Sequence, residues 1–450
     1  MTDFTPFLAC LSACLGPIPL RQLTCLIPAM LAITGRVTMK GLSRWALTGA
    51  SYRTIQRFFH TVVAWKQIHW LFIRHHLLDP DDVYLVAGDE VVISKAGKDT
   101  FGLARFFSSL CNRPIPGLCF LTLSLVSVKH RTSYPLCSEQ LVKNNSSGAP
   151  KEMKRSKGSK EKAKQPAATT PPSPGRPKGS KNRSRVEVEL SPFLLFLQRL
   201  IRELQVLLNN TLSIRYFLYD GELGHNDAAQ MVRKVGWHLI SKLRFDSALF
   251  LPFEGPYAGR GPKRKYGDKL DYKCLPERFL TETTREDNIE TRIYQIPVWH
   301  KLFPDQLNVA IIVKTNLLNA KTARVILFTT DLSLGFSCLI DYYHLRFQIE
   351  FNFRDAKQYW GLEDFMVTDQ IPVYNSANLA FFMINLSQVL IRPKRIASPD
   401  FSIIDLKSLA RGTRYVLETL KLLPVLPDPI LIDRLFSRLA DIGAIHPASG

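Results

Sequence analysis

The sequence predicts an α/β protein whose strand-containing core lies between helical regions at the two ends of the chain. Three observations support this fold class. Residues 1–78 and 371–450 have the apolar spacing of helices, strands and helices alternate between them, and residues 248–330 are rich in strands. At 450 residues, with 46% hydrophobic and 22% charged residues, the chain is long enough for more than one hydrophobic core.

The charge of the chain favours a polyanionic partner. The formal net charge is +20 at pH 7, which suits nucleic acid or an anionic membrane surface. No apolar run approaches the ~20 residues of a membrane span. The N-terminus contains Asp3 and no basic stretch, which argues against a signal peptide. We therefore expect an intracellular protein that binds nucleic acid and not membranes.

Cysteine and histidine do not form metal motifs in this sequence. The 8 cysteines include no CxxC pair, and the 10 histidines include no HExxH motif. Any catalytic metal must therefore be held by carboxylates, which suits Mg²⁺ or Mn²⁺.

The helical region 1–78 is predicted to bind DNA. Ser51 can cap a short helix that exposes Arg53 and Arg57. This helix follows the segment MKGLSRWAL across a short turn. The spacing fits a helix-turn-helix and fits plain helical packing equally well. Arg53 and Arg57 are candidate DNA contacts.

A basic low-complexity segment divides the middle of the chain. Residues 79–142, with strands near VYLVAGDEVVI and PGLCFLTLSLVSV, form the first part of the core. Residues 143–186 contain thirteen Lys and Arg, two Glu and six Pro, the composition of a disordered basic linker. The linker's GRPKGSKN sequence is similar to the core of a minor-groove AT-hook, but Pro174 stands where Arg is expected. Nonspecific phosphate contact is the simpler interpretation.

Strands and helices resume after the linker. Residues 187–247 alternate helix, strand, helix and strand, and form the second part of the core. Residues 248–330 form a β-rich insertion with a basic loop at 259–269. Arg264 and Lys265 in this loop are candidate DNA contacts.

One helix is predicted in the unit 331–370. The segment DYYHLRFQIEFNFRDAKQYWGLEDF (341–365) has no Pro or Gly before Gly361, which predicts a helix that ends there. At about 100° per residue, four polar residues share one stripe beside an apolar stripe. They are Tyr343, Arg346, Glu350 and Lys357. A solvated salt-bridge ladder explains this stripe as well as a functional site does.

Two aspartates lie at the ends of apolar strands, where burying a carboxylate costs free energy. Asp89 ends the apolar strand YLVAG, and Asp220 ends YFLY. A carboxylate at the end of a buried strand carries a desolvation penalty unless a cation meets it, although either Asp alone could cap a turn. Together with Glu350 they supply the three oxygen donors of a two-metal phosphoryl-transfer site. Rivals for the first position are Asp81, Asp82, Glu90 and Asp99, with Glu90 on the opposite strand face from Asp89.

The spacing of the four stripe residues, Y-x2-R-x3-E-x6-K, resembles the YREK signature of bacterial insertion-sequence transposases of the DDE superfamily (the IS-four-like family). GDEVVISKAGKDTFGLARFFSS around Asp89 and YDGELGHND around Asp220 are similar to the first and second Asp motifs of that family. The resemblance spans about residues 30–390. Val91 departs from the small hydroxyl residue that many relatives carry there.

The resemblance implies an RNase H-like catalytic core with a β-rich insertion. It implies cut-and-paste DNA transposition with Mg²⁺ or Mn²⁺, acting on the element's terminal inverted repeats and on target DNA. A homodimer in a synaptic complex and a location in the bacterial cytoplasm, associated with the nucleoid, follow from the same resemblance.

The resemblance also implies roles for individual residues. The catalytic metal ligands would be Asp89, Asp220 and Glu350. Arg346 and Lys357 would grip phosphates at the element end, and Tyr343 would help to position that strand. Trp299 would be a candidate for stacking a flipped base, although a core Trp beside a proline is the simpler interpretation.

Two other functions fit the sequence. One is a DNA-binding protein derived from a transposase that has lost its chemistry, against which the presence of all six motif residues argues. The other is a structure-selective nuclease on the same core.

Overall fold

The computed structural model describes residues 4–46, 50–108, 111–143, 185–257, 259, 261–439, 442 and 444–446. The predicted linker at 143–186, including its AT-hook-like sequence, lies almost entirely outside the described residues.

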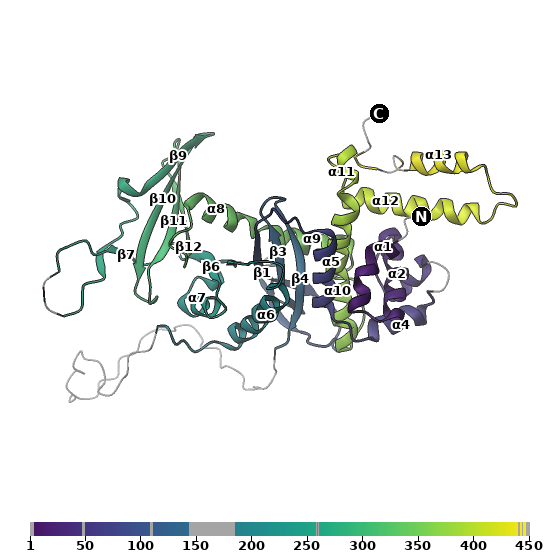
Figure 1. The fold of residues 1–450 in the computed structure, drawn as a ribbon, viewed down its shortest axis with the longest axis horizontal. Coiled ribbons are helices and arrows are strands. Elements are labelled where there is room, and N and C mark those ends of the chain that lie inside the picture. Colours follow the sequence, from purple (N-terminus) through teal and green to yellow (C-terminus); the bar gives the residue numbers. More distant parts are fainter. Residues whose placement is uncertain are drawn as a thin grey trace, which may run out of the picture.

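A mixed sheet forms the centre of the molecule (Figure 1). Within the described residues it has 12 strands in the order β2-β3-β1-β5-β6-β12-β11-β10-β7-β8, with β4 paired to β3 and β9 paired to β10. The strands are β1 (Tyr84–Ser94), β2 (Ala104–Ser108), β3 (Arg113–Ser127), β4 (Thr132–Leu141), β5 (Tyr216–Leu218), β6 (His238–Leu243), β7 (Leu249–Pro252), β8 (Tyr266–Lys269), β9 (Leu280–Glu286), β10 (Ile289–His300), β11 (Leu307–Asn316) and β12 (Thr322–Thr329).

Strand β1 joins two differently built parts of the sheet. On one side it pairs antiparallel with β3, and on the other it pairs parallel with β5, which pairs parallel with β6. The strands of 248–330 continue the same sheet, because β12 pairs antiparallel with β6. The predicted insertion is therefore hydrogen-bonded to the core strands along its inner edge.

Helices cover both faces of the sheet. They are α1 (Thr5–Leu8), η1 (Ala9–Ala13), α2 (Pro17–Ala32), α3 (Met39–Trp45), α4 (Tyr52–His60), α5 (Trp65–His76), α6 (Pro192–Leu208), η2 (Gly221–Leu223), α7 (Asn226–Arg233), η3 (Glu277–Phe279), α8 (Phe336–Leu345), α9 (Gln348–Tyr359), α10 (Gln370–Ile391), α11 (Lys394–Ala397), α12 (Ile403–Leu420) and α13 (Pro429–Leu439). Successive strand residues face opposite sides. Val86 and Phe217 pack in the cluster that includes α6 and α7, whereas Leu85 and Ala87 pack with the α8 residue Leu339.

Helix α10 lies between the sheet and the N-terminal helices (Figure 1). Its Asn375 accepts a hydrogen bond from Trp65 Nε1 (2.8 Å) and donates to the carbonyl of Phe59 (2.7 Å). Its Asn385 donates to the carbonyl of Pro135 on β4 (2.9 Å). No helix in the described part of the chain is both long and apolar enough to cross a membrane. Helix α10 instead joins the N-terminal helices and the sheet into one packed core.

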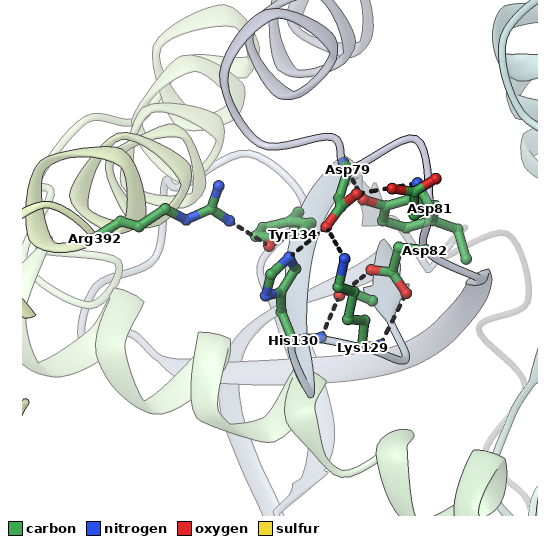
Figure 2. A network of polar contacts seen from close by, with 9 residues as sticks. Asp79, Asp81, Asp82, Lys129, His130, Tyr134 and Arg392 are labelled. Atoms are coloured by element: carbon green, nitrogen blue, oxygen red, sulfur yellow. Dashed lines mark hydrogen bonds and ion pairs between the residues drawn. The ribbon is translucent and has the colours of Figure 1, made fainter. Parts of the chain in front are cut away.

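A polar network fixes the beginning of β1 (Figure 2). Asp79 accepts a hydrogen bond from Lys129 Nζ in the β3–β4 turn (2.7 Å), and this contact lowers the pKa of Asp79 to about 2. Asp82 accepts from the Lys129 backbone N–H (2.8 Å). Arg392, just after α10, donates to Tyr134 on β4 (3.4 Å). The turn is thereby held against the entry to β1.

The predicted single helix within 341–365 is wrong, because the structure has two helices there. Helix α8 ends at Leu345 and α9 begins at Gln348. Between them, the backbone N–H groups of Arg346 and Phe347 bond to carbonyls three residues earlier. Helix α8 packs on β6, β11 and β12, whereas α9 packs on β1 and β4. Because a sheet twists from strand to strand, one straight helix would not follow both sets of strands.

The end of α9 is as predicted, and it contacts the N-terminal region. Gly361 has φ of 76°, in the left-handed region that favours glycine. A Cβ on Gly361 would lie 2.3 Å from Val37 Cβ. Beside it, the Val37 backbone N–H donates to Asp364 Oδ2 (2.9 Å). The N-terminal region therefore packs directly on the turn that follows α9.

We expect Gly361→Ala to destabilise the protein more than Gly35→Ala. Gly35 also has positive φ, 72°, but its missing Cβ would meet nothing within 4 Å. Left-handed strain alone should cost G35A about 1 kcal/mol, and overpacking against Val37 should bring the cost of G361A to about 3 kcal/mol. Urea denaturation of both variants measures the difference. Equal losses in the free energy of unfolding would mean that Val37 moves away from the added methyl group without a free-energy cost.

Candidate active site

The two predicted aspartates meet where β1 and β5 separate. The parallel pairing of these strands ends at Ala87 and Leu218. Asp89 and Asp220 each follow two residues later, so they lie at equivalent positions beyond the last rung. The Asp220 carboxylate accepts the backbone N–H of Glu222 (2.9 Å) at the start of η2. Local turn geometry thus fixes one aspartate beside the other.

Arg346 connects the β1 aspartate to the glutamate on α9. Its Nη1 donates to Asp89 Oδ2 and its Nη2 donates to Glu350 Oε1, both at 3.1 Å. The Arg346 side chain is only 13% exposed, against 22% for Asp89 and 40% for Glu350. This burial excludes the solvated-ladder interpretation, since the guanidinium lies between carboxylates from two different elements.

The charges at this edge of the sheet strongly affect one another. Burial and the nearby carboxylates of Asp220 and Glu350 together raise the pKa of Asp89 to about 6, against the opposing effects of the Glu90 backbone N–H and Arg346. Burial also raises the pKa of Tyr343, whose ring centroid lies 5.9 Å from the Arg346 guanidinium. The structure therefore joins Asp89 and Glu350 through Arg346, with Tyr343 beside the guanidinium and Asp220 near enough to affect the pKa of Asp89.

Lys357 lies further along β1, and a second lysine lies near it. Lys357 Nζ donates to the Val92 carbonyl (2.8 Å) and pairs with Glu363 (3.1 Å). Lys95, just after β1, donates to the carbonyls of Glu363 (2.9 Å) and Phe365 (2.8 Å). Lys357 thus connects α9 to β1, and Lys95 connects the end of β1 to the turn after α9. Lys95 is missing from the sequence-based site, because one Lys after an apolar strand is a weak signal.

The rival acidic residues lie elsewhere. Glu90 faces the opposite side of β1, where Cys119 Sγ lies 3.7 Å from its carboxylate, and burial raises its pKa to about 7. Asp81 and Asp82 precede β1, and Asp99 is exposed in the loop after it. Of the candidates for the first position, Asp89 is the one that contacts Arg346.

The other predicted DNA contacts lie away from the carboxylates. Arg53 and Arg57 are exposed on α4, in the N-terminal helices, and Ser51 caps α4 as predicted. Arg264 and Lys265 lie in the loop between β7 and β8, at the far end of the sheet (Figure 1). Lys265 Nζ lies 5.0 Å from the centroid of Trp299, which is half-buried rather than a core residue.

The donor set suits a hard divalent cation. Asp89, Asp220 and Glu350 offer carboxylate oxygens, the ligands that Mg²⁺ and Mn²⁺ prefer. Their mutual effect on the pKa of Asp89 shows negative charge that a cation would stabilise. In the described part of the chain, no three His, Cys, Asp or Glu side chains are already grouped closely enough to hold a metal. Arg346 lies between two of the carboxylates.

Comparison with known families gives one match. A family model described as "DDE superfamily endonuclease" matches residues 10–295, more than half of the 450-residue chain. The matched residues include Asp89 and Asp220 and end before α8. No curated protein matches the chain significantly.

We expect Lys95→Met to loosen the turn after α9. The variant loses two charge-assisted hydrogen bonds to carbonyls, and for this half-buried lysine we expect a loss of about 2 kcal/mol. Exposed Lys98→Met is the matched control and should change stability by less than about 0.5 kcal/mol. Urea denaturation, with amide hydrogen exchange at residues 361–368, tests this. Unchanged exchange in K95M would show that Lys95 does not hold the turn.

Proposed function

Because this chain belongs to the DDE superfamily of endonucleases, we propose that it is a transposase that cuts DNA at the ends of a mobile element and joins those ends to target DNA. The observation that carries the proposal is the bridge that Arg346, only 13% exposed, makes between Asp89 and Glu350, with Asp220 near enough to raise the pKa of Asp89. A carboxylate cluster built from three separate elements is costly for the fold, and metal-dependent phosphoryl transfer explains why the chain retains it.

Within this proposal the strands β4-β3-β1-β5-β6 form an RNase H-like core. The strand order supports it, because three antiparallel strands are followed by two parallel ones, with α6 and α7 in the connections. The strands β7–β12 are then the β-rich insertion between the second Asp and the Glu. The Y-x2-R-x3-E-x6-K spacing supports membership of the YREK group of insertion-sequence transposases.

The proposed chemistry assigns a task to each group. Asp89, Asp220 and Glu350 would hold Mg²⁺ or Mn²⁺, which would supply activation of the attacking water or 3′-hydroxyl and stabilisation of the leaving oxygen. Arg346, which contacts Asp89, and Lys357, which contacts the Val92 carbonyl further along β1, bind phosphates of the cleaved strand.

Tyr343 and the more distant basic residues complete the proposed DNA contacts. Tyr343 packs beside Arg346 and helps to position the cleaved strand. Arg53 and Arg57 on exposed α4 bind the terminal inverted repeat, and Arg264 and Lys265 contact DNA on the insertion. The distance of both pairs from the carboxylates suits a long duplex or a synaptic complex of two protomers, acting in the bacterial cytoplasm and nucleoid.

We expect amide variants of the three carboxylates to stop cleavage while DNA binding remains. D89N, D220N and E350Q each remove a metal-binding charge and keep the side-chain shape. Cleavage of element ends should fall by about a thousandfold, which is about 4 kcal/mol in the activation free energy. End binding should change by less than about threefold, because affinity comes mainly from phosphate and groove contacts.

The matched control is Glu90→Gln, next to Asp89 but on the other face of β1. E90Q should cleave within about threefold of wild type. The assay uses labelled DNA carrying the inverted repeats that flank the gene, with Mg²⁺. Normal cleavage by D89N would reject the first-Asp assignment. Cleavage of unrelated branched DNA in preference to these ends would instead favour a structure-selective nuclease.

A further inference from the structure

Arg346 holds a position at which the proposed reaction requires a different cation. Its guanidinium is bound on one side to Asp89 (3.1 Å) and on the other to Glu350 (3.1 Å). Both carboxylates are proposed metal ligands. A single buried side chain thus neutralises, from within the chain, the charge that the metal would neutralise.

The hydrogen bonding of Arg346 is incomplete in this arrangement. Its Nε is buried and has no hydrogen-bond partner among the described residues. Buried donors are normally paired, and leaving one unpaired costs free energy. An arginine in its final functional position would be expected to use this donor. The contacts to Asp89 and Glu350 therefore give both carboxylates a hydrogen-bond donor but leave one donor of the arginine without an acceptor.

We propose that Arg346 is the counter-ion of the metal-free site, and that a divalent cation displaces it from Asp89 and Glu350 and frees it for a DNA phosphate. This inference rests on the proposed function and adds to it a relation between metal binding and DNA binding. A metal bound through Asp89 Oδ2 and Glu350 Oε1, the oxygens that Arg346 uses, would repel the guanidinium, so the metal and Arg346 compete. A phosphate accepts the planar, forked donors of a guanidinium well, and it would also pair with the Nε–H.

This competition couples metal binding to DNA binding. A phosphate that draws Arg346 away uncovers the carboxylates, and a metal that takes the carboxylates releases Arg346. Such coupling is reciprocal, so each ligand raises the affinity for the other. The protein without DNA then binds metal weakly, and the metal site becomes fully occupied only when DNA is bound.

The test measures metal binding without DNA. Mn²⁺ is titrated calorimetrically into the full chain, using wild type, Arg346→Met and Arg354→Met. R354M is the matched control, because Arg354 lies on the same helix and pairs with Asp355 instead of the catalytic carboxylates. We expect R346M to bind Mn²⁺ at least tenfold more tightly than wild type, and R354M to stay within about twofold.

A second readout separates this role from a purely structural one. Without metal, R346M should melt below wild type, because Asp89 and Glu350 lose their shared cation. Saturating Mn²⁺ should shrink or reverse that deficit, since the metal replaces the missing charge. Should R346M fail to fold, Arg346→Lys is used, and its Mn²⁺ affinity should lie above that of wild type because one ammonium cannot reproduce the two-armed bridge.

The outcomes distinguish this inference from the proposed function. Equal or weaker Mn²⁺ binding by the Arg346 variant, or a melting deficit that Mn²⁺ leaves unchanged, would overturn the counter-ion role alone. Mn²⁺ binding to wild type that E350Q and D89N do not weaken would overturn the proposed metal site itself. Tighter binding by R346M that E350Q abolishes in the double variant supports both.

Discussion

The architecture of the site depends on charge held between one strand and one helix. Asp89 on β1 and Glu350 on α9 would repel each other, and Arg346 between them turns that repulsion into an attachment. Lys357 adds a hydrogen bond from α9 to β1, and Lys95 adds two from beyond β1 to the turn after α9. The same contacts that align the carboxylates therefore also hold the helix against the sheet, so the geometry of the candidate site and the packing of α9 are maintained together.

The break between α8 and α9 places Arg346 between β1 and α9. Helix α8 follows from β12, and β12 pairs with β6, so the insertion leads through α8 directly to the site. The joint lies where the supporting strands change from β6, β11 and β12 to β1 and β4. The position of the arginine is thus set by sheet twist as well as by charge.

Local patterns predicted the parts of the site that depend on neighbouring residues. Asp89 and Asp220 were found because each ends an apolar strand, and Gly361 because it ends a helical run. The helix break at Arg346 was not found, since periodicity does not reveal which strands a helix will cross. Lys95 and strands β2 and β4 were also not found. Their roles come from contacts with segments far away in the chain, which no local pattern contains.

The buried helix α10 limits how this protein can be divided. Its side chains pack on β4 on one side and on α4 and α5 on the other, and Asn375 and Asn385 are bonded to both parts. The N-terminal helices therefore share their apolar core with the sheet and do not form a separately linked module. In a chimera that exchanges only residues 1–78, the new N-terminal helices would pack against an α10 whose side chains fit a different partner. Recombination between relatives should preserve function only where the N-terminal helices and α10 are inherited together.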